Sequence, residues 1–438
     1  MKNHILRTIA SNDFVRRLGK VTQFFGQVIE SNGPDVYVGE CCEISTPSHD
    51  EPVLAEVVGL KNNHVLLLPY GDVKGIRLGC EVIALGHSMS VPVSDDLLGR
   101  VVGAFGKPLD DKGDIVSNKK YNLFSEPVNP LSRSRINVVL DTGIKAIDTL
   151  LTLGKGQRMG IFSGSGVGKT TLLGMIARNM SADVNVIALI GERGREVLDF
   201  LEKALGDEGL KRSVVVVATS DQPALIRTHA ALTATAIAEY FRDQGKDVLL
   251  TMDSVTRVAM AQREIGIAVG EPPTSRGYTP SVFAMLPRML ERSGVVQGGG
   301  SITSLYTVLV EGDDMNDPIA DSLRAILDGH IILSRDLANS GHYPPIDILK
   351  STSRLADDLL DKEDIKLAVQ LTKIVDKYES SRDMVELGAY QKGSNSEIDS
   401  VIEIMPEVNT FLCQDTSESL THSQSKSLLK KLIAKYYD

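Results

Sequence analysis

The chain has 438 residues, a formal net charge of −10, 5% aromatic residues and no tryptophan. This length exceeds what one hydrophobic core usually holds and predicts two or three domains. An acidic chain with few aromatic side chains is unlike proteins that bind nucleic acids, because those need basic residues for the phosphates and rings for the bases. We therefore expect no nucleic-acid partner.

Cysteine usage and the lack of long apolar runs predict a cytoplasmic protein. The four cysteines, of which Cys41 and Cys42 are adjacent, show no C-x-x-C spacing, which is typical of free thiols in a reducing compartment. The basic N-terminus lacks a signal-peptide core, and no apolar run approaches the roughly 20 residues that span a bilayer. Any membrane association is expected to be peripheral and to depend on partners.

The chain changes its pattern three times. Short apolar runs between turn-forming clusters, such as VTQFFGQVIE and EVIALG, predict a small β-barrel over residues 20–92. A connector punctuated by Gly and Pro follows over residues 93–134. Apolar strands then alternate with helices over residues 135–349, which predicts an α/β domain with a mostly parallel sheet covered on both faces. Residues 350–438 predict a helical domain.

The sequence FSGSGVGKTT, residues 162–171, predicts a phosphate-binding loop between a strand and a helix. The strict pattern G-x-x-x-x-G-K-[ST] expects glycine at position 163 and finds Ser163, where the loop only begins. Glycines allow backbone N–H groups to approach phosphates, Lys169 is expected to reach the β and γ phosphates, and the Thr170 hydroxyl is expected to bind Mg²⁺. The alternative is a glycine-rich turn with a fortuitous lysine. Nucleotide binding is assigned to Gly164, Ser165, Gly166, Val167, Gly168, Lys169, Thr170 and Thr171.

Two further strand ends carry candidate catalytic residues. The strand VLLTMD ends in Asp253, a carboxylate expected to hold water on Mg²⁺, with a helix cap as the alternative. The strand ALIGER ends in Glu192 and Arg193, which are expected to orient the attacking water and to stabilise charge on the γ-phosphate. The alternative for this pair is a solvated helix start, and Glu196 competes with Glu192 as the base.

Several long blocks show a resemblance to a known family. GERGREV, AEYFRDQGKDVLLTMDSVTRVAMAQREIG, GEPPTSRGYTPSVF and DPIADSLRAILDGHIILSR resemble the ATPases of type III protein export, which are related to the catalytic subunit of rotary F-type ATPases. The resemblance spans roughly residues 20–415. SDQPAL, MAQREIG, GYTPSVF and ADSLRAILDGH are more similar to the flagellar branch than to the virulence-injectisome branch. The resemblance implies a RecA-like P-loop core and an ATP-hydrolysing motor that uses ATP and Mg²⁺ to energise release of cargo and its entry at an export gate.

The resemblance also assigns roles to single residues. It makes Glu192 the catalytic carboxylate and leaves Glu196 as a helix position, and it places Arg193 and Arg257 on the γ-phosphate side. The remaining residues that it assigns are Arg354, as a finger inserted into a neighbouring subunit's site; Tyr343, as a ring packed on adenine; Phe411, as a second adenine-side ring; and Thr416, where rotary relatives carry a further aromatic residue. For Tyr343 an ordinary core position is the alternative.

Partners are likewise implied by the resemblance. They are a homohexameric ring of this chain, a peripheral-stalk regulator at residues 1–19, a central-stalk coiled-coil protein, and export-gate and chaperone–cargo complexes at the inner membrane. Asp313, Asp314, Asp317 and Asp321 form an acidic loop expected to face the stalk. Two features depart from the family pattern, namely the triplet Gly298–Gly300 and the tail after residue 415. The alternatives are an injectisome ATPase, a ring-shaped RNA translocase and a non-catalytic nucleotide-binding subunit.

Overall fold

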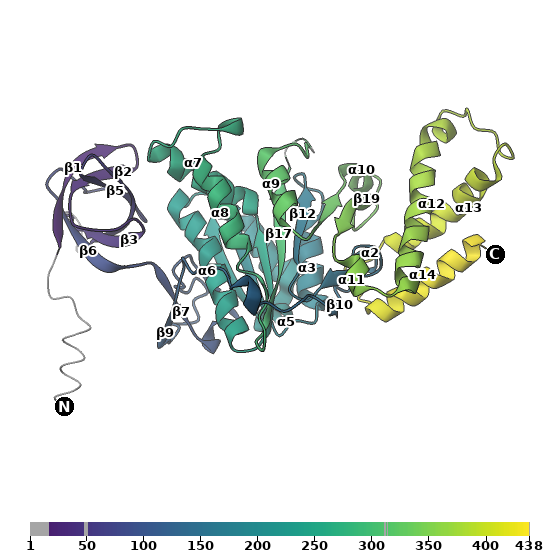
Figure 1. Cartoon of the computed structure of the whole chain (residues 1–438), viewed down its shortest axis with the longest axis horizontal. Coiled ribbons are helices and arrows are strands. Elements are labelled where there is room, and N and C mark those ends of the chain that lie inside the picture. The colour runs from purple at the N-terminus through teal and green to yellow at the C-terminus, as the bar shows by residue number, and fades with distance from the viewer. Residues whose placement is uncertain (1–16, 48–50, 311, 313, 438) are drawn as a thin grey trace.

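The computed structural model describes residues 17–47, 51–310, 312 and 314–437. These residues form an N-terminal β-barrel, a central α/β domain and a C-terminal group of helices, which follow one another along the longest axis of the molecule (Figure 1). Among the described residues, none of the helices combines the length and the hydropathy that a bilayer crossing requires.

The barrel closes through antiparallel pairs. Its strands run in the order β1 (Leu18–Phe25), β2 (Val28–Asn32), β5 (His64–Pro69), β4 (Val53–Lys61), β3 (Glu40–Ile44) and β6 (Glu81–Ser88). Apolar side chains that alternate along these strands fill the interior, among them Ile29, Ile44, Val57, Leu67 and Val82.

The barrel is attached to the central domain by a buried polar contact. Glu56 of β4 accepts a hydrogen bond from the Tyr70 hydroxyl, and its Oε2 lies 3.0 Å from Nε2 of His229 in helix α6 (Ala224–Asp243). All three side chains are buried, so Glu56 joins the two domains through paired polar groups, while Nδ1 of His229 has no hydrogen-bond partner among the described residues.

A nine-stranded sheet forms the centre of the molecule. Its order is β19 (Ile346–Ser353), β18 (Gly329–Leu333), β12 (Arg158–Ser163), β17 (Ser301–Leu309), β15 (Asp247–Asp253), β13 (Val184–Glu192), β14 (Ser213–Thr219) and β8 (Arg100–Val102), with β16 (Gly294–Val295) paired to β17. The pairs are parallel except those of β19 and β16. Central strands such as VVVVA are buried on both faces, as expected for a parallel sheet between helices.

Helices cover both faces of this sheet. On one face lie α6, α7 (Val255–Ala268), α8 (Pro280–Leu290) and α9 (Pro318–Ile326), and on the other lie α2 (Lys145–Leu150), α3 (Lys169–Asn179) and α5 (Gly206–Lys211) (Figure 1). Shorter elements connect them: β7 (Ser90–Val93), β9 (Lys119–Asn122), β10 (Val139–Leu140), β11 (Leu153–Gly154), α4 (Gly194–Asp199), η3 (Phe200–Leu205) and α10 (Arg335–Asn339).

The sheet reaches beyond the boundaries that the sequence suggested. Strand β8 lies inside the predicted connector over residues 93–134 and adds a parallel edge to β14. Strand β19 continues to Ser353, past the predicted end of the strands at residue 350. Both are edge strands, which are short or half exposed and therefore lack the buried apolar run that marks a central strand.

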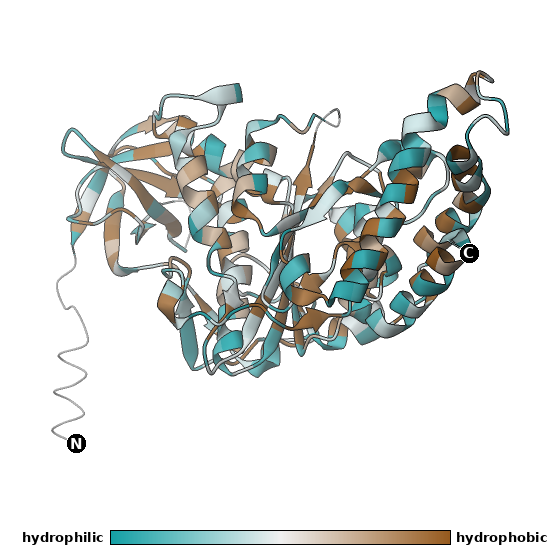
Figure 2. Ribbon diagram, turned by 45° about the vertical axis from the view of Figure 1, so that its right-hand side comes forward, coloured by the Kyte–Doolittle hydropathy of each residue, from teal (hydrophilic) through white to brown (hydrophobic). Residues whose placement is uncertain are grey.

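The C-terminal helices pack onto the face of the sheet that carries α3. They are α11 (Ala356–Leu359), α12 (Lys362–Glu386), α13 (Ser396–Leu412) and α14 (His422–Tyr437). Their apolar sides share one hydrophobic core with α2 and α3, and Figure 2 shows brown apolar segments turned toward the interior. The tail after residue 415 therefore belongs to the fold through α14.

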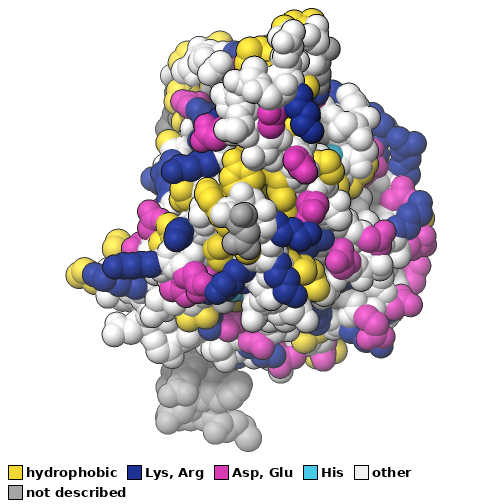
Figure 3. All heavy atoms as spheres, turned by 90° about the vertical axis from the view of Figure 1, so that its right-hand side faces the viewer, with side chains coloured by type: hydrophobic (Ala, Val, Ile, Leu, Met, Phe, Trp, Pro, Cys, Tyr) yellow, Lys and Arg dark blue, Asp and Glu magenta, His cyan; other side chains and the backbone are white. Residues whose placement is uncertain are grey.

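The outer surface of these helices carries charges of both signs (Figure 3). Some of these charges form ion pairs between helices, for example Lys430 with Glu363 at 2.7 Å and Lys435 with Glu407 at 2.7 Å. Exposed pairs of this kind contribute little stability, so the apolar side holds the helices in place.

One glycine of the triplet Gly298–Gly300 is required by close packing of the backbone. Gly298–Gly300 forms the turn between β16 and β17, and a Cβ at Gly300 would overlap the carbonyl oxygen of Lys246. Only glycine allows the two backbones to approach this closely.

Candidate active site

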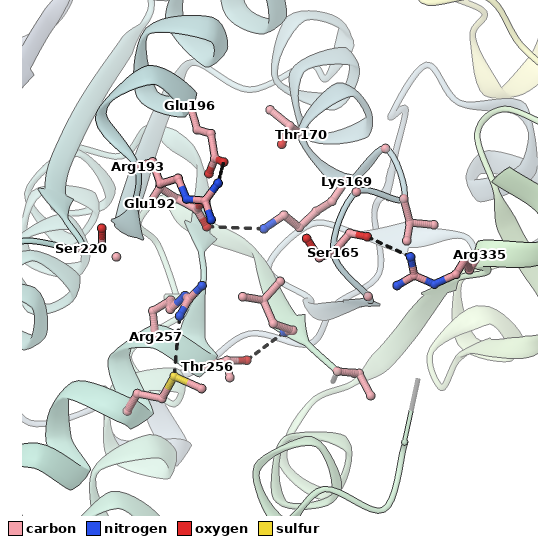
Figure 4. A pocket seen from close by; sticks show the side chains of 18 of the residues that line it. Ser165, Lys169, Thr170, Glu192, Arg193, Glu196, Ser220, Thr256, Arg257 and Arg335 are labelled. Atoms are coloured by element: carbon pink, nitrogen blue, oxygen red, sulfur yellow. Dashed lines mark hydrogen bonds and ion pairs between the residues drawn. The ribbon is translucent and has the colours of Figure 1, made fainter. Parts of the chain in front are cut away.

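A cavity of about 640 Å³ opens at the carboxyl ends of β12, β13, β15 and β17. This is the edge at which parallel α/β sheets bind ligands. Its lining residues come from the P-loop, from the ends of two strands and from α7, and several are drawn in Figure 4: Ser165, Lys169, Thr170, Glu192, Arg193, Glu196, Ser220, Thr256, Arg257 and Arg335.

The P-loop connects β12 to α3. Gly166 and Gly168 have φ angles of 75° and 93°, a left-handed conformation that favours glycine. Ser163 is the last residue of β12 and is buried, so the departure from the motif lies in the strand and not in the loop. The loop therefore keeps the conformation that directs N–H groups toward a phosphate.

Lys169 lies between two carboxylates. Its Nζ donates to Oδ1 of Asp253 and lies 3.7 Å from Oε1 of Glu192. The Asp253 side chain is 4% exposed and also accepts a hydrogen bond of 2.8 Å from the hydroxyl of Thr307. The structure thus brings together three of the predicted residues, Lys169 from the first turn of α3 and the two carboxylates from the ends of β13 and β15.

The two candidate bases occupy different surroundings. Burial first, then a hydrogen bond with Glu196 and the charge of Asp253, raise the pKa of Glu192 to about 7. The same hydrogen bond lowers the pKa of Glu196, which faces outward and lies 3.8 Å from Nη1 of Arg193. A pKa near neutrality suits a group that accepts a proton at physiological pH, and Glu192 is also the carboxylate that lies beside Lys169, so its expected role as the base stays the preferred prediction.

The arginines lie at different depths. Arg193 is exposed at the mouth of the cavity, whereas Arg257 packs against Gly191, and its Nη1 lies 3.9 Å from Sδ of Met260. The buried Nε of Arg257 has no hydrogen-bond partner among the described residues. A desolvated guanidinium with spare donors is suited to an anionic ligand.

Sequence reasoning missed three contributors. Arg335 donates to the carbonyl of Ser165 at 3.3 Å, the Thr256 hydroxyl accepts from the Leu309 amide at 2.8 Å, and Thr307 orients Asp253. Arg335 follows the end of β18, and the apolar run HIIL of that strand was a usable signal. The threonines sit in apolar or helical runs and carry no signal in the sequence.

The two aromatic residues expected beside adenine differ in exposure. Tyr343 is 50% exposed, and its ring lies next to the P-loop, since a Cβ at Gly168 would be 3.6 Å from Cε1 of Tyr343. Phe411 is 7% exposed in the apolar side of α13 and does not line the cavity. The amphipathic helix turns Phe411 toward the core, and its expected role as a second adenine-side ring stays a prediction.

Arg354 is placed far from the P-loop of its own chain. At the P-loop end of β12, Ser163 pairs with Leu333 of β18, and Leu333 pairs with Ile346 of β19. At the other end of β12, Met159 pairs with Gly329, and Gly329 pairs with Ser353. Arg354 follows Ser353 and is exposed. At about 3.3 Å per residue the two ends of the strand are more than about 10 Å apart, so Arg354 does not reach this cavity in its own subunit.

Comparison with known proteins agrees with this architecture. Models of the ATP synthase alpha/beta family match residues 21–86, as the β-barrel domain, and 143–353, as the nucleotide-binding domain, and residues 360–431 match the C-terminal domain of the type III secretion ATPase EscN. The flagellum-specific ATP synthase of Bacillus subtilis is 52% identical over 429 residues, which cover 98% of each chain. The chain belongs to the family of flagellum-specific and type III secretion ATPases.

Other members of this family span both branches. The type 3 secretion system ATPase of Xanthomonas euvesicatoria is 46% identical and covers 97% of this chain and 96% of its own. The assembled ATPase EscN of enteropathogenic E. coli superposes with a TM-score of 0.90 at 44% identity, over 95% of this chain and 100% of that chain. Both flagellar and injectisome members are thus close relatives of this export ATPase.

Magnesium fits the residues beside the P-loop. Mg²⁺ prefers oxygen ligands, and the Thr170 hydroxyl and the buried Asp253 carboxylate both lie next to Lys169. The described residues contain no group of three or more His, Cys, Asp or Glu side chains that suits a metal by itself.

The acidic loop is only partly described. Arg276 pairs with Asp314 at 2.6 Å and with Asp317 at 3.3 Å, and Asp317 caps α9 by accepting from the Ile319 amide. Asp313 and residues 1–16, on which the stalk and regulator contacts were expected, lie outside the described residues. Two of the aspartates therefore have structural roles within the chain.

Proposed function

We propose that this chain is the ATP-hydrolysing subunit of a bacterial type III protein export apparatus, in which hydrolysis energises release of cargo from chaperones and entry at the export gate. The observation that carries the proposal is the meeting of Lys169, Glu192 and Asp253 beside an intact P-loop. A non-catalytic nucleotide-binding subunit would not need a water-orienting carboxylate. Membership of the export ATPase family argues against an RNA translocase.

The P-loop binds the phosphates of ATP. Backbone N–H groups of the loop and the N-terminal end of α3 favour an anion, and Lys169 exchanges carboxylate partners for phosphate oxygens. Mg²⁺, held by Thr170 and through water by Asp253, would supply charge neutralisation between the phosphates. Tyr343 offers the adenine a flat face beside Gly168.

Glu192 serves as the base for the attacking water. Its carboxylate lies beside Lys169 at the bottom of the cavity, where it accepts a proton when ionised. Arg193 and Arg257 face the same space and stabilise negative charge as it develops on the γ-phosphate.

A ring of copies completes the site. Arg354 is exposed at the edge of the sheet opposite the P-loop, a position suited to a neighbouring subunit's nucleotide. EscN, which is similar to this chain, forms an assembly and has been solved with its central stalk EscO. We extend both properties to this chain, as a homohexamer with a central-stalk partner and a peripheral-stalk regulator, located in the cytoplasm at the inner-membrane export gate.

The flagellar branch is our preferred reading. The Bacillus subtilis relative at 52% identity and the Treponema pallidum relative at 52% identity are both flagellum-specific. An injectisome role is the second candidate, which the 46% identity to the Xanthomonas protein supports.

A mixing experiment tests hydrolysis and the ring together. Arg354→Ala and Glu192→Gln proteins should each bind MgATP and hydrolyse it at less than about 1% of the parent rate, because each lacks one group that acts in the transition state. At a one-to-one ratio, random rings place an intact Glu192 against an intact Arg354 at about one quarter of the interfaces. Recovery toward that fraction is expected, and no recovery at any ratio would refute a finger supplied in trans.

A further inference from the structure

Gln414 joins the C-terminal helices to the nucleotide-binding domain. It follows α13, is 6% exposed, and its amide makes three hydrogen bonds. Oε1 accepts from the Lys145 amide at 2.8 Å, while Nε2 donates to the carbonyls of Gly143 at 2.6 Å and Glu418 at 2.9 Å. One side chain thus satisfies backbone groups from segments 271 residues apart.

The backbone of Gln414 also holds the tyrosine beside the P-loop. Its N–H donates to the carbonyl of Tyr343 at 2.8 Å, and the ring of Tyr343 lies against Gly168. Because a half-exposed ring has few contacts of its own, its position depends on where its backbone is anchored.

The residues that follow Gln414 form the wall of a second cavity. Thr416 and Ser417 line a cavity of about 730 Å³ together with Thr170 and Thr171, the residues that begin α3. Thr170 also lines the cavity that holds the P-loop, so the two spaces adjoin. Arg178 fixes this wall by donating to the Thr416 carbonyl at 3.0 Å.

We propose that Gln414 is a positioning residue for the nucleoside half of the nucleotide. It touches no phosphate and no catalytic group, but it sets Tyr343 on one side and the Thr416–Ser417 wall on the other. This inference rests on the proposed function only in that it takes the ligand to be a nucleotide. It predicts that loss of the Gln414 amide weakens binding of the base and ribose and leaves binding of the phosphates intact.

Calorimetric titration of the full chain with MgADP and with magnesium tripolyphosphate tests this. In Gln414→Ala the dissociation constant of MgADP should rise about tenfold, because three buried backbone groups lose their partner, whereas that of tripolyphosphate should change less than about twofold. In Gln414→Asn the amide is kept but lies one methylene group closer to the backbone, so an intermediate effect is expected. Asn409→Ala, an exposed change on the preceding helix α13, is the matched control.

Steady-state kinetics give a second readout. The KM for ATP should rise with the MgADP constant in Gln414→Ala, while kcat at saturating ATP stays within about twofold of the parent, because the catalytic groups are untouched.

Two results would overturn the inference. Equal weakening of MgADP and tripolyphosphate would make Gln414 a purely structural residue, and unchanged MgADP binding in both Gln414 variants would remove its role. If Gln414→Ala does not fold, Gln414→Asn decides by the same comparison. If the parent protein binds MgADP but does not hydrolyse ATP, the proposed hydrolysis is refuted. The role of Gln414 in nucleotide binding is then decided by the titration alone.

Discussion

Glu196 is expected to set the pH dependence of hydrolysis through its contact with Glu192. Burial raises the pKa of Glu192 from 4.5 to about 7 and is the largest cause of the shift. Glu196 also raises this pKa, through a hydrogen bond and through its charge. Burial would remain if Glu196 were replaced. In the Glu196→Ala variant the Glu192 pKa should therefore fall only in part, to about 6. Since Glu192 must be ionised to accept a proton, activity should be lost as the pH falls through its pKa.

The size of the effect follows from the fraction of ionised Glu192. At pH 6 a group with a pKa of about 7 is roughly one tenth ionised, and a group with a pKa of about 6 is about half ionised. Relative to the plateau at high pH, kcat/KM at pH 6 should thus be about fivefold higher in Glu196→Ala than in the parent.

The assay is kcat/KM for ATP from about pH 5.5 to about pH 9 at saturating Mg²⁺ and constant ionic strength, because kcat/KM reports groups of the free enzyme. Glu202→Ala, an exposed change close by in the chain, is the matched control and should leave the acid limb in place. An acid limb that does not move in Glu196→Ala would refute the argument. Loss of activity at every pH would instead make Glu196 the base.

Two further predictions concern stability. Glu239 and Arg292 form a buried bidentate ion pair, with Nε–Oε1 at 2.9 Å and Nη2–Oε2 at 2.5 Å. Glu239→Ala should destabilise the central domain by about 3–5 kcal/mol, because it leaves a buried charge without its partner. Replacing both residues with leucine should restore most of the melting temperature. Gly300→Ala should lower the melting temperature by several degrees, because the new Cβ would overlap the Lys246 carbonyl. Gly299→Ala should leave the melting temperature unchanged, because its Cβ would make an ordinary contact at 3.5 Å to Val296. Equal melting temperatures of the two variants would contradict the close approach at Gly300.

The sequence predicts those parts of the site whose residue pattern lies within one short segment. The P-loop, Asp253 and Glu192 each follow a buried apolar strand, and parallel strands bring such ends to one edge of a sheet. The order of the strands, which decides that Asp253 and Glu192 both reach Lys169, depends on pairing between distant segments and has no local pattern. Family resemblance supplied the roles of Arg257 and Tyr343, for which the residues alone gave no reason.

Burial and long-range pairing decide the features that the sequence does not predict. Phe411 is buried on the apolar side of α13, which the sequence did not indicate. The three residues of β8 become a strand only because β14 offers them an edge. Gln414 is an ordinary polar residue in sequence, and its four hydrogen bonds appear only when the C-terminal helices meet the turn at Gly143.

The charges around the P-loop support the proposal that a single copy of this chain is an incomplete site. Among the described residues, Lys169, Arg193, Arg257 and Arg335 bring positive charge to the cavity, but the carboxylates of Glu192, Glu196 and Asp253 offset most of it. A triphosphate adds several negative charges in a partly desolvated space, where unbalanced charge is costly. Mg²⁺ offsets part of this charge, and the guanidinium of Arg354, exposed at the opposite edge of the sheet, is placed to supply the remainder to a neighbour. We therefore expect charge balance in the transition state to require a second subunit, so that hydrolysis would depend on assembly.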